Sequence, residues 1–362
     1  MSIRERIEAF EQSALSEFAA RASGSRGRRE PEAPCPTRTC FMRDRDRIIH
    51  TAKAFRRLAH KTQVFISPRD DHYRTRLSHT LEVAQIARTL AKALRLNEDL
   101  TEAIALAHDL GHAPYGHAGE EGLNEVMTRA LPGGSFHHAV HSLRVVDELE
   151  RGGRGLNLTW EVRNGIVGHT KGRQELESAL GDGAATLEAD LVKVADRIAY
   201  LNHDLDDAVR AGVMVLEDLP TDALGVLGSS HGERVGRMVE DVVRTSLDRP
   251  SIGLSAEIAE ATEVIKEYLF DHVYLNARAA NADRANIKRL LGQLFEHFLA
   301  HPEKLPNPHP ALDLDAPADR ARAVCDYIAG MTDRYAKQAY IDVFLPVDWR
   351  TPDLDTHRGA GE

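Results

Sequence analysis

The sequence has few cysteines, few aromatic residues and no long apolar run. Cys35, Cys40 and Cys325 are the only cysteines among 362 residues, and none is paired at a zinc-like spacing. Such a sparse, odd set excludes a disulfide framework and is typical of a reducing compartment. No apolar stretch approaches the roughly 20 residues that cross a bilayer, and the charged N-terminus lacks the apolar segment of a signal peptide. We therefore predict a cytoplasmic protein that does not enter a membrane.

The charge is unevenly distributed along the chain. The formal net charge is −10, yet the segment from Arg21 to Arg76 has 15 basic and 6 acidic residues, a local balance of +9. The remainder therefore carries −19. A basic segment on an acidic protein can attract a polyanion, either a nucleotide or single-stranded nucleic acid, or it can be a solvated face. The sign of the charge alone leaves these alternatives open.

Apolar periodicity predicts an all-α fold with one minor β element. Apolar residues recur at helical spacing in most of the chain. The β-forming residues between 61 and 76 surround a turn and predict a short hairpin. We expect three regions: an N-terminal helix and flexible basic loop (1–43), a helical core (44–211) and a helical C-terminal region that packs on it (212–362). The expected helices cover 1–20, 44–60, 77–96, 98–109, 119–130, 138–150, 159–168, 186–211, 233–246, 255–271, 280–301 and 316–338.

Four residues on separate helical segments form a candidate metal site. His79 lies within the 77–96 helix, His108 and Asp109 end the next one, and Asp196 opens a later one. Imidazole and carboxylate ligands together suit Mn, Fe, Co, Zn or Mg. Four protein ligands leave positions on an octahedral ion for water and a phosphate oxygen. Taken singly, each residue could instead be a hydrogen-bonded core histidine or a helix-capping aspartate.

The run HDLGHAPYGHAGE favours a functional site over a packed core. It adds His112, His117 and Glu120 to the His108–Asp109 pair within one short segment. A core would have to satisfy all these titratable groups with hydrogen bonds, whereas a site beside a helix break can use them.

Longer motifs resemble a known family. The order His79, His108–Asp109, Asp196 resembles the H…HD…D signature of the HD superfamily. The sequence is also similar to deoxyguanosine-triphosphate triphosphohydrolase-like proteins between residues 40 and 211 and near 326–336. The blocks that carry this similarity are RDRDRIIHTAKAFRRLAHKTQVF, HYRTRLSHTLEVAQIAR, LAHDLGHAPYGHAGE, ADRIAYLNHDLDDA and DYIAGMTDRYA.

The resemblance implies an HD-domain core and a reaction. One divalent ion would be held by His79, His108, Asp109 and Asp196, and a second Mg could accompany the nucleotide. Water would attack the α-phosphorus of a deoxynucleoside triphosphate, releasing the deoxynucleoside and tripolyphosphate. The poor 5′-oxygen leaving group needs a general acid, for which we expect His117.

The family also implies supporting catalytic residues. Glu120 and His138 would orient the imidazoles, and His112 would contact phosphate or complete the relay. His138 is placed by FHHAVHSL, which resembles the family run F-E-H-N-x-Q-S but departs from it at His137, Ala139 and His141.

Substrate contacts follow from the same resemblance. Arg76, one helical turn before His79, and Arg197 match phosphate-contacting positions. Tyr200 would pack against the sugar and Asp204 would accept a bond from its 3′-hydroxyl; these two follow Asp196 by four and eight residues and so share its helix face. Gln63 would be a further sugar contact.

Other readings stay open. The chain could be an HD phosphohydrolase that acts on a nucleoside monophosphate, a cyclic dinucleotide or an alarmone. It could also be a regulator that binds nucleotide or nucleic acid without catalysis. The family further implies a homo-oligomer and an allosteric nucleotide, which Arg56 and Arg57 could bind, although these arginines could equally form surface salt bridges.

Overall fold

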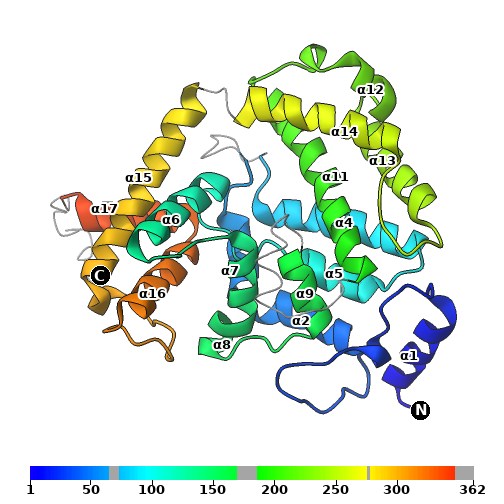
Figure 1. Cartoon of the computed structure of the whole chain (residues 1–362), viewed down its shortest axis with the longest axis horizontal. Helices are drawn as coiled ribbons and strands as arrows, with labels where there is room; N and C mark the ends of the chain where they lie inside the picture. Colours follow the sequence, from blue (N-terminus) through cyan, green and yellow to red (C-terminus); the bar gives the residue numbers. More distant parts are fainter. Residues whose placement is uncertain (65–72, 169–185, 275–277, 347–362) are drawn as a thin grey trace, which may run out of the picture.

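The computed structural model describes residues 1–64, 73–168, 186–274 and 278–346, and helices dominate all four ranges (Figure 1). These residues contain no strand, so the all-α fold class is confirmed. They contain two isolated antiparallel bridges, Arg28 with Thr159 and Thr62 with Thr75. The second bridge joins the ends of the segment for which a hairpin was predicted. The turn of that hairpin lies outside the described residues.

The first half of the chain holds the elements that surround the candidate metal ligands. Its helices are α1 (Ile3–Ala14), α2 (Cys40–Thr51), α3 (Lys53–Arg57), α4 (Arg76–Ala93), α5 (Glu98–Ala107), α6 (Gly116–Ala130), α7 (His138–Arg144), α8 (Glu150–Gly153) and α9 (Trp160–Gly168).

The second half begins with the longest described helix. Its helices are α11 (Leu187–Arg210), α12 (Thr221–Leu227), α13 (His231–Ser246), α14 (Ala256–Leu269), α15 (Arg278–Ala300), α16 (Pro317–Ala329) and α17 (Asp333–Phe344). Short 3-10 turns lie at Ala22–Gly24, Leu58–His60, Leu216–Asp218 and Pro302–Lys304, and π turns at Val145–Leu149 and Phe270–Tyr274.

Local side chains fix where the two central helices begin. The hydroxyl of Thr75 accepts the backbone N–H of Ser78 at the start of α4, and the side-chain oxygen of Ser78 accepts the backbone N–H of Thr75. Thr186 caps α11 in the same way through the N–H of Ala189. Each cap satisfies a backbone donor that the first helical turn leaves free. The caps therefore fix the register in which α4 and α11 present their functional residues.

The larger hydrophobic core lies around α4 and α11, which pack side by side at the centre of Figure 1. Their facing residues are wholly buried or nearly so. They include Val83, Ala87 and Leu90 from α4, and Ile198, Leu201 and Leu205 from α11. Helices α5, α9 and α13 also pack against this pair. This core holds the helices of the four candidate metal ligands in fixed relative positions.

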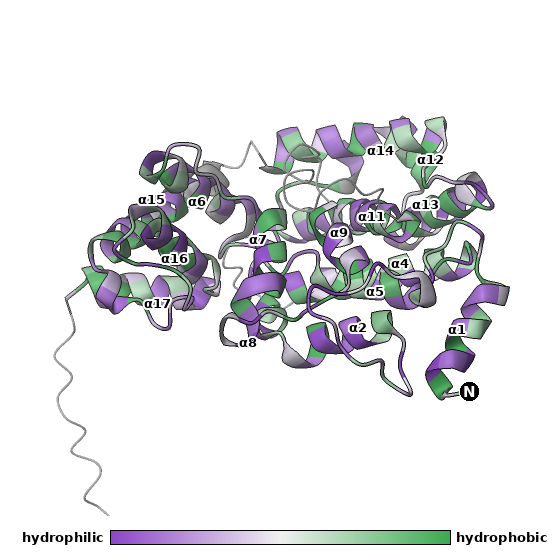
Figure 2. Cartoon of the chain, turned by 60° about the horizontal axis from the view of Figure 1, so that its bottom comes forward, coloured by the Kyte–Doolittle hydropathy of each residue, from purple (hydrophilic) through white to green (hydrophobic). Residues whose placement is uncertain are grey.

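A second, smaller core joins α6 to the C-terminal helices, on the left in Figure 1. Leu123 and Met127 of α6 pack with Leu291 and Leu294 of α15 and with Val324 of α16. Figure 2 shows the apolar residues of these helices interleaved with polar ones around the helix surfaces. Helix α6 therefore belongs to the second core, and the loop before it connects the two cores.

Some helix boundaries differ from the sequence expectation. A single helix was predicted over 316–338, but Gly330 ends α16 and Thr332 caps α17 by accepting the N–H of Tyr335. The predicted 44–60 helix begins earlier, at Cys40, and breaks where Ala52 adopts an extended conformation. Helix α7 passes into a π turn instead of continuing regularly to 150. Capping side chains and backbone breaks, which apolar periodicity does not reveal, explain these differences.

The basic segment before α2 is held on the core, although we expected a flexible loop. The guanidinium of Arg28 forms an ion pair with Asp44, whose side chain is wholly buried. Asp44 also accepts hydrogen bonds from the backbone and side chain of Thr159, at 2.9 and 2.7 Å. Part of the local positive charge is thus neutralised inside the protein.

Every helix in the described ranges falls short of the length and apolarity that a bilayer crossing requires.

Candidate metal centre and active site

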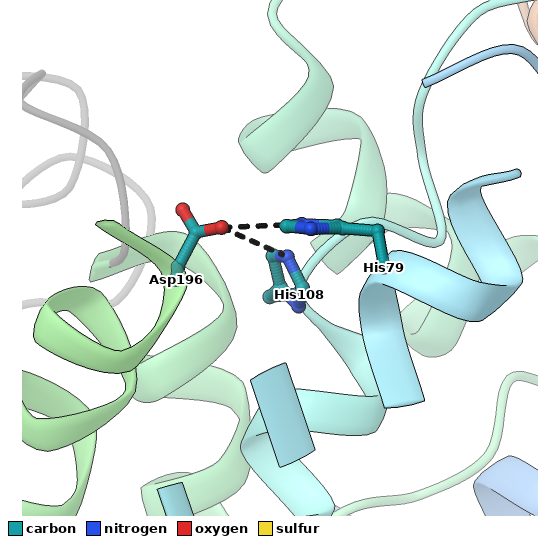
Figure 3. Close-up of side chains that lie close together, drawn as sticks. All are labelled: His79, His108 and Asp196. Carbon is teal, nitrogen blue, oxygen red and sulfur yellow. Dashed lines mark ion pairs between the residues drawn. The ribbon is translucent and has the colours of Figure 1, made fainter. Parts of the chain in front are cut away.

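The elements of the larger core bring together residues that are far apart in the sequence. His79 lies one turn into α4, directly after the capped start of that helix. Helix α5 ends at Ala107, so His108 is its C-terminal cap and Asp109 follows in the turn. Asp196 faces His79 and His108 from α11 (Figure 3). The helix end brings the adjacent side chains of His108 and Asp109 within 3.5 Å of each other.

The four candidate ligands form a ring of short contacts. The Nε2 of His79 lies 3.1 Å from the Oδ1 of Asp196 and 3.9 Å from the Oδ2 of Asp109. The Nε2 of His108 lies 4.0 Å from the Oδ1 of Asp196 and 3.5 Å from the Oδ1 of Asp109. Two ligands at about 2.1 Å from one ion are about 3 to 4.2 Å apart. The spacing and the mixed nitrogen and oxygen donors of His79, His108 and Asp196 therefore fit one divalent ion. Asp109 approaches His79 and His108 with different carboxylate oxygens and groups more closely with His112 and His138.

The charges of the two carboxylates also suit a cation. Burial opposes the ionisation of Asp196, but the hydrogen bond from His79 and the fields of His79 and His108 lower its pKa to about 2. Burial likewise opposes the ionisation of Asp109. The field of His108, the hydrogen bond from His112 and the charge of Arg76 outweigh that effect and hold the pKa of Asp109 well below its usual value. Both side chains are therefore anionic at neutral pH.

Arg76 lies closer to the metal site than the sequence suggested. Its side chain is 2% exposed, and its Nη1 donates to the Oδ2 of Asp109 at 2.6 Å. Its buried Nε has no hydrogen-bond partner among the described residues. A Cβ on Gly116 would lie 3.1 Å from the Nη2 of Arg76, and Gly116 has a φ of +58°. The backbone before α6 thus passes close to the guanidinium, which a larger residue at 116 would crowd.

A second group of side chains extends from Asp109 toward the surface. The Nε2 of His112 lies 3.3 Å from the Oδ1 of Asp109, and the imidazole of His112 stacks on that of His138 at 4.0 Å between ring centroids. Both the backbone N–H of His138, at 2.9 Å, and its Nδ1, at 2.8 Å, are bound by the Oε1 of Glu120. The other carboxylate oxygen of Glu120 is 3.2 Å from the Nδ1 of His117. We call His112, His117, Glu120 and His138 the imidazole group.

The members of the imidazole group differ in exposure and charge. The His117 side chain is 71% exposed, whereas His112 is buried. Burial, together with the charge of Arg76, holds the pKa of His112 well below its usual value, so this imidazole is neutral. Burial opposes the ionisation of Glu120, but hydrogen bonds from His117 and His138 keep its pKa well below the usual range. An anionic carboxylate therefore lies between one exposed and one buried imidazole.

The departures from the family run leave the contacts of His138 in place. His137 lies beside the same carboxylate, with its Nδ1 3.6 Å from the Oε1 of Glu120. His141 is buried, and its Nδ1 lies 3.8 Å from the Oδ1 of Asp326 instead of next to Glu120. Burial, with the charges of Lys61 and Arg144, holds the pKa of His141 well below its usual value.

The predicted substrate contacts lie on two sides of the ligand ring. Tyr200 and Arg197 follow Asp196 on α11 and are half-buried. Burial, together with the charges of Asp196 and Asp204, raises the pKa of Tyr200 to about 12, while Arg197 acts in the opposite direction. Gln63 is half-buried, and its side-chain oxygen has no hydrogen-bond partner among the described residues.

Asp204 is buried and faces a neighbour on its own helix. The Oδ1 of Asp204 lies 2.8 Å from the Nδ1 of His203, whose Nε2 lies 2.7 Å from the Nδ1 of His79. The sequence reasoning gave His203 no role, although it follows Asp196 by seven residues and so shares the same helix face. That spacing was the available signal.

Two more residues that support the site had no predicted role. Asp333, within the family block DYIAGMTDRYA, accepts the N–H and hydroxyl of Thr62 with one carboxylate oxygen. Its other oxygen accepts the N–H of Tyr115 at 2.8 Å. The buried Lys61 donates to the carbonyl of His112 and, at 2.8 Å, to that of Ala329. Both residues attach the C-terminal helices to the loops around the site.

Comparisons with known proteins match this arrangement. A model of the HD domain matches residues 76–201, and one of the phosphohydrolase-associated domain matches residues 252–342. A deoxyguanosinetriphosphate triphosphohydrolase-like protein of Caldanaerobacter subterraneus subsp. tengcongensis is 52% identical over 96% of this chain and 98% of its own length. Proteins with the same name are 47% identical in Desulfatibacillum aliphaticivorans (96% and 99% covered) and 44% in Clostridium perfringens strain 13 (96% and 98% covered).

Proposed function

The chain belongs to the deoxyguanosinetriphosphate triphosphohydrolase-like family of HD-domain proteins, and from this membership we propose that it hydrolyses a deoxynucleoside triphosphate to the deoxynucleoside and tripolyphosphate. The coarser activity, that of a metal-dependent phosphohydrolase, rests on the HD domain. The observation that carries the finer proposal is the imidazole group next to the ligand ring, with Asp109 touching both.

We assign the cation to His79, His108, Asp109 and Asp196. Their donor types and spacing support this assignment, and their two anionic carboxylates would balance a divalent charge. A divalent ion held there would supply Lewis-acid polarisation of a phosphate oxygen and activation of water. Mn, Fe, Co, Zn and Mg all suit such a mixed site, and a second Mg accompanying the nucleotide stays a prediction.

His117 is our candidate for the general acid. Its Nδ1 lies 3.2 Å from the Oε2 of Glu120, which can accept a hydrogen bond from that nitrogen. The exposed Nε2 edge could then donate a proton to the departing 5′-oxygen of the sugar. Glu120 also binds His138, whose ring stacks on His112, so the half-buried carboxylate and the two buried imidazoles would orient His117.

The remaining assignments concern substrate recognition. Arg76 lies beside Asp109, which supports a role in neutralising a phosphate oxygen next to the cation. Arg197 would contact the same phosphates, and Tyr200 would pack against the sugar. Gln63 has a side-chain oxygen available for a sugar hydroxyl. Asp204 would accept a hydrogen bond from the 3′-hydroxyl.

Product analysis tests the proposal. The purified protein is incubated with each dNTP, singly and mixed, with several divalent metals, and products are separated by chromatography. Equal amounts of deoxynucleoside and tripolyphosphate are expected. Asp196→Ala should remove turnover, whereas Asp190→Ala, which removes an exposed carboxylate on the same helix, should retain it. Pyrophosphate or orthophosphate as the only phosphorus product would contradict the proposal and favour another HD phosphohydrolase activity.

His117→Ala separates an enzyme from a non-catalytic regulator. An enzyme loses turnover in this variant while it still binds nucleotide, whereas a regulator keeps its biological activity. Homo-oligomer formation, binding of single-stranded nucleic acid and activation by a second nucleotide stay predictions. Activation predicts tripolyphosphate from mixed dNTPs but not from single ones.

A further inference from the structure

One metal-ligand candidate has a buried imidazole directly behind it. The Nδ1 of His79 lies 2.7 Å from the Nε2 of His203, and the two rings are nearly perpendicular, at 84°. His203 is wholly buried, and its other ring nitrogen lies 2.8 Å from the Oδ1 of Asp204, which is also buried. Asp204, His203 and His79 therefore follow one another toward the ring of ligands.

The contact between the two imidazoles requires one donor and one acceptor. A neutral imidazole carries a proton on one nitrogen only, so the direction of the bond decides which nitrogen of His79 has a free lone pair. If Nδ1 of His79 donates, its Nε2 can bind a cation. If His203 donates instead, the proton of His79 stays on Nε2 and points at Asp196, and His79 cannot be a ligand.

Asp204 selects between these two directions. Of the two carboxylates near the ring, that of Asp204 is the closer, since its Oδ1 lies 2.8 Å from the Nδ1 of His203 whereas the Oε2 of Glu82 lies 4.0 Å from the Nε2. The closer carboxylate favours the tautomer that carries its proton on Nδ1. The Nε2 of His203 is then an acceptor, so the Nδ1 of His79 must donate. The ring N–H of His203 does not point straight at the carboxylate oxygen, although the distance is that of a hydrogen bond.

We propose that His203 is a positioning residue that, with Asp204 behind it, holds His79 in the tautomer and orientation that leave its Nε2 free for a divalent cation. The inference rests on the metal-binding part of the proposed function. Hydrogen-bond partners of ligating histidines act in this way in metal sites, and their loss typically weakens metal binding about 10- to 100-fold. Asp204 would consequently influence the cation as well as the sugar.

Metal binding without nucleotide tests this role. Protein stripped with a chelator is titrated with Mn²⁺, and free Mn²⁺ is measured by electron paramagnetic resonance. His203→Leu, which fills the space without an acceptor, should weaken Mn²⁺ binding about 10- to 100-fold. His203→Gln, whose amide oxygen can accept from the Nδ1 of His79, should recover most of that loss. Rescue by glutamine would not be expected if His203 only filled the core.

Two further variants keep the test decisive. His141→Gln removes another buried imidazole, one that faces Asp326, and should leave Mn²⁺ affinity unchanged. If His203→Leu does not fold, Asp204→Asn serves as the second variant, because it removes the charge that fixes the His203 tautomer. Asp204→Asn should weaken Mn²⁺ binding severalfold. Circular dichroism and thermal melting of the metal-free proteins check that each variant is folded.

The outcomes separate this inference from the proposed function. The role of His203 would be overturned by a folded His203→Leu variant whose Mn²⁺ affinity is unchanged, even if the wild type hydrolyses dNTPs. If His203→Leu is not folded, unchanged affinity in Asp204→Asn would have the same meaning. Conversely, wild-type protein that hydrolyses no dNTP but shows the expected order of Mn²⁺ affinities would overturn the proposed reaction and leave the positioning role intact.

Discussion

Replacing Lys61 with methionine should flatten the dependence of folding stability on pH between pH 7 and pH 9. Lys61 is buried between the active-site loop and the C-terminal helices, and its ammonium group donates to two backbone carbonyls, those of His112 and Ala329. Burial, with the charges of Arg57 and Arg76, lowers the pKa of Lys61 from 10.5 to about 7, while the charges of Asp333 and Asp109 act in the opposite direction. The folded protein thus binds this proton more weakly than the unfolded chain does.

The sign and size of the effect follow from that difference. Below pH 7 Lys61 is protonated in both states, and burial of its charge then lowers the free energy of unfolding by its full amount. Above pH 7 the folded state loses the proton first while the unfolded chain keeps it up to about pH 10.5, so stability rises with pH. The slope is about 1.4 kcal/mol per pH unit, reduced near pH 7 by partial protonation, which gives about 2 kcal/mol between pH 7 and pH 9.

Urea unfolding at several pH values measures this increment. The difference between wild type and Lys61→Met should change by about 2 kcal/mol across the range, since contributions from groups that do not interact with Lys61 cancel. Lys53→Met removes an exposed lysine from α3 and should show no such change. The absolute stability of Lys61→Met is not the test, because the variant also leaves two buried carbonyls without a donor. Parallel pH profiles for wild type and Lys61→Met would refute the reasoning.

Three further outcomes are expected. Gly111→Ala should lower the free energy of unfolding in urea by about 3 kcal/mol, because its Cβ would lie 2.1 Å from the backbone nitrogen of Ser142. Gly236→Ala is the control, because a Cβ there meets no atom within 4 Å. Equal losses in the two variants would contradict the close approach at Gly111. Asp44→Asn should cost about 3 kcal/mol and expose the segment around Arg28 to trypsin; an unchanged digestion pattern would argue against the ion pair that holds it. A saturating divalent metal should raise the melting temperature of chelator-stripped protein, and no shift in a folded sample would count against the metal site.

Much of the ligand ring was predictable from the sequence, because each residue has a recognisable position on a helix. His79 lies one turn after a capped start, and the stop signal at Gly111 marks the helix end where His108 and Asp109 can point in one direction. Asp196 lies on α11 within the sequence block ADRIAYLNHDLDDA and faces His79 and His108. These are local features, and local features are what a sequence pattern reports.

The partners of those residues could not be predicted in the same way. The contact between His79 and His203 depends on the rotation of α4 and α11 about their own axes, which the packing of many apolar side chains decides. The attachment of Thr62 and Tyr115 to Asp333 depends on how a separate hydrophobic cluster places α17. Neither rotation nor placement leaves a periodic signal in the sequence.

Asp109 explains why the ligand ring and the imidazole group should be understood as one site. One of its oxygens faces Arg76 and His79, and the other faces His108 and His112. A side chain within a regular helix would have its direction fixed by the helical period, but Asp109 follows the last turn of α5, where the backbone is free to aim it between the two groups. The charge that helps to hold a cation also adjoins the stacked imidazoles. Any change in the charge of Asp109 must therefore act on cation binding and on the proton-transferring residues together.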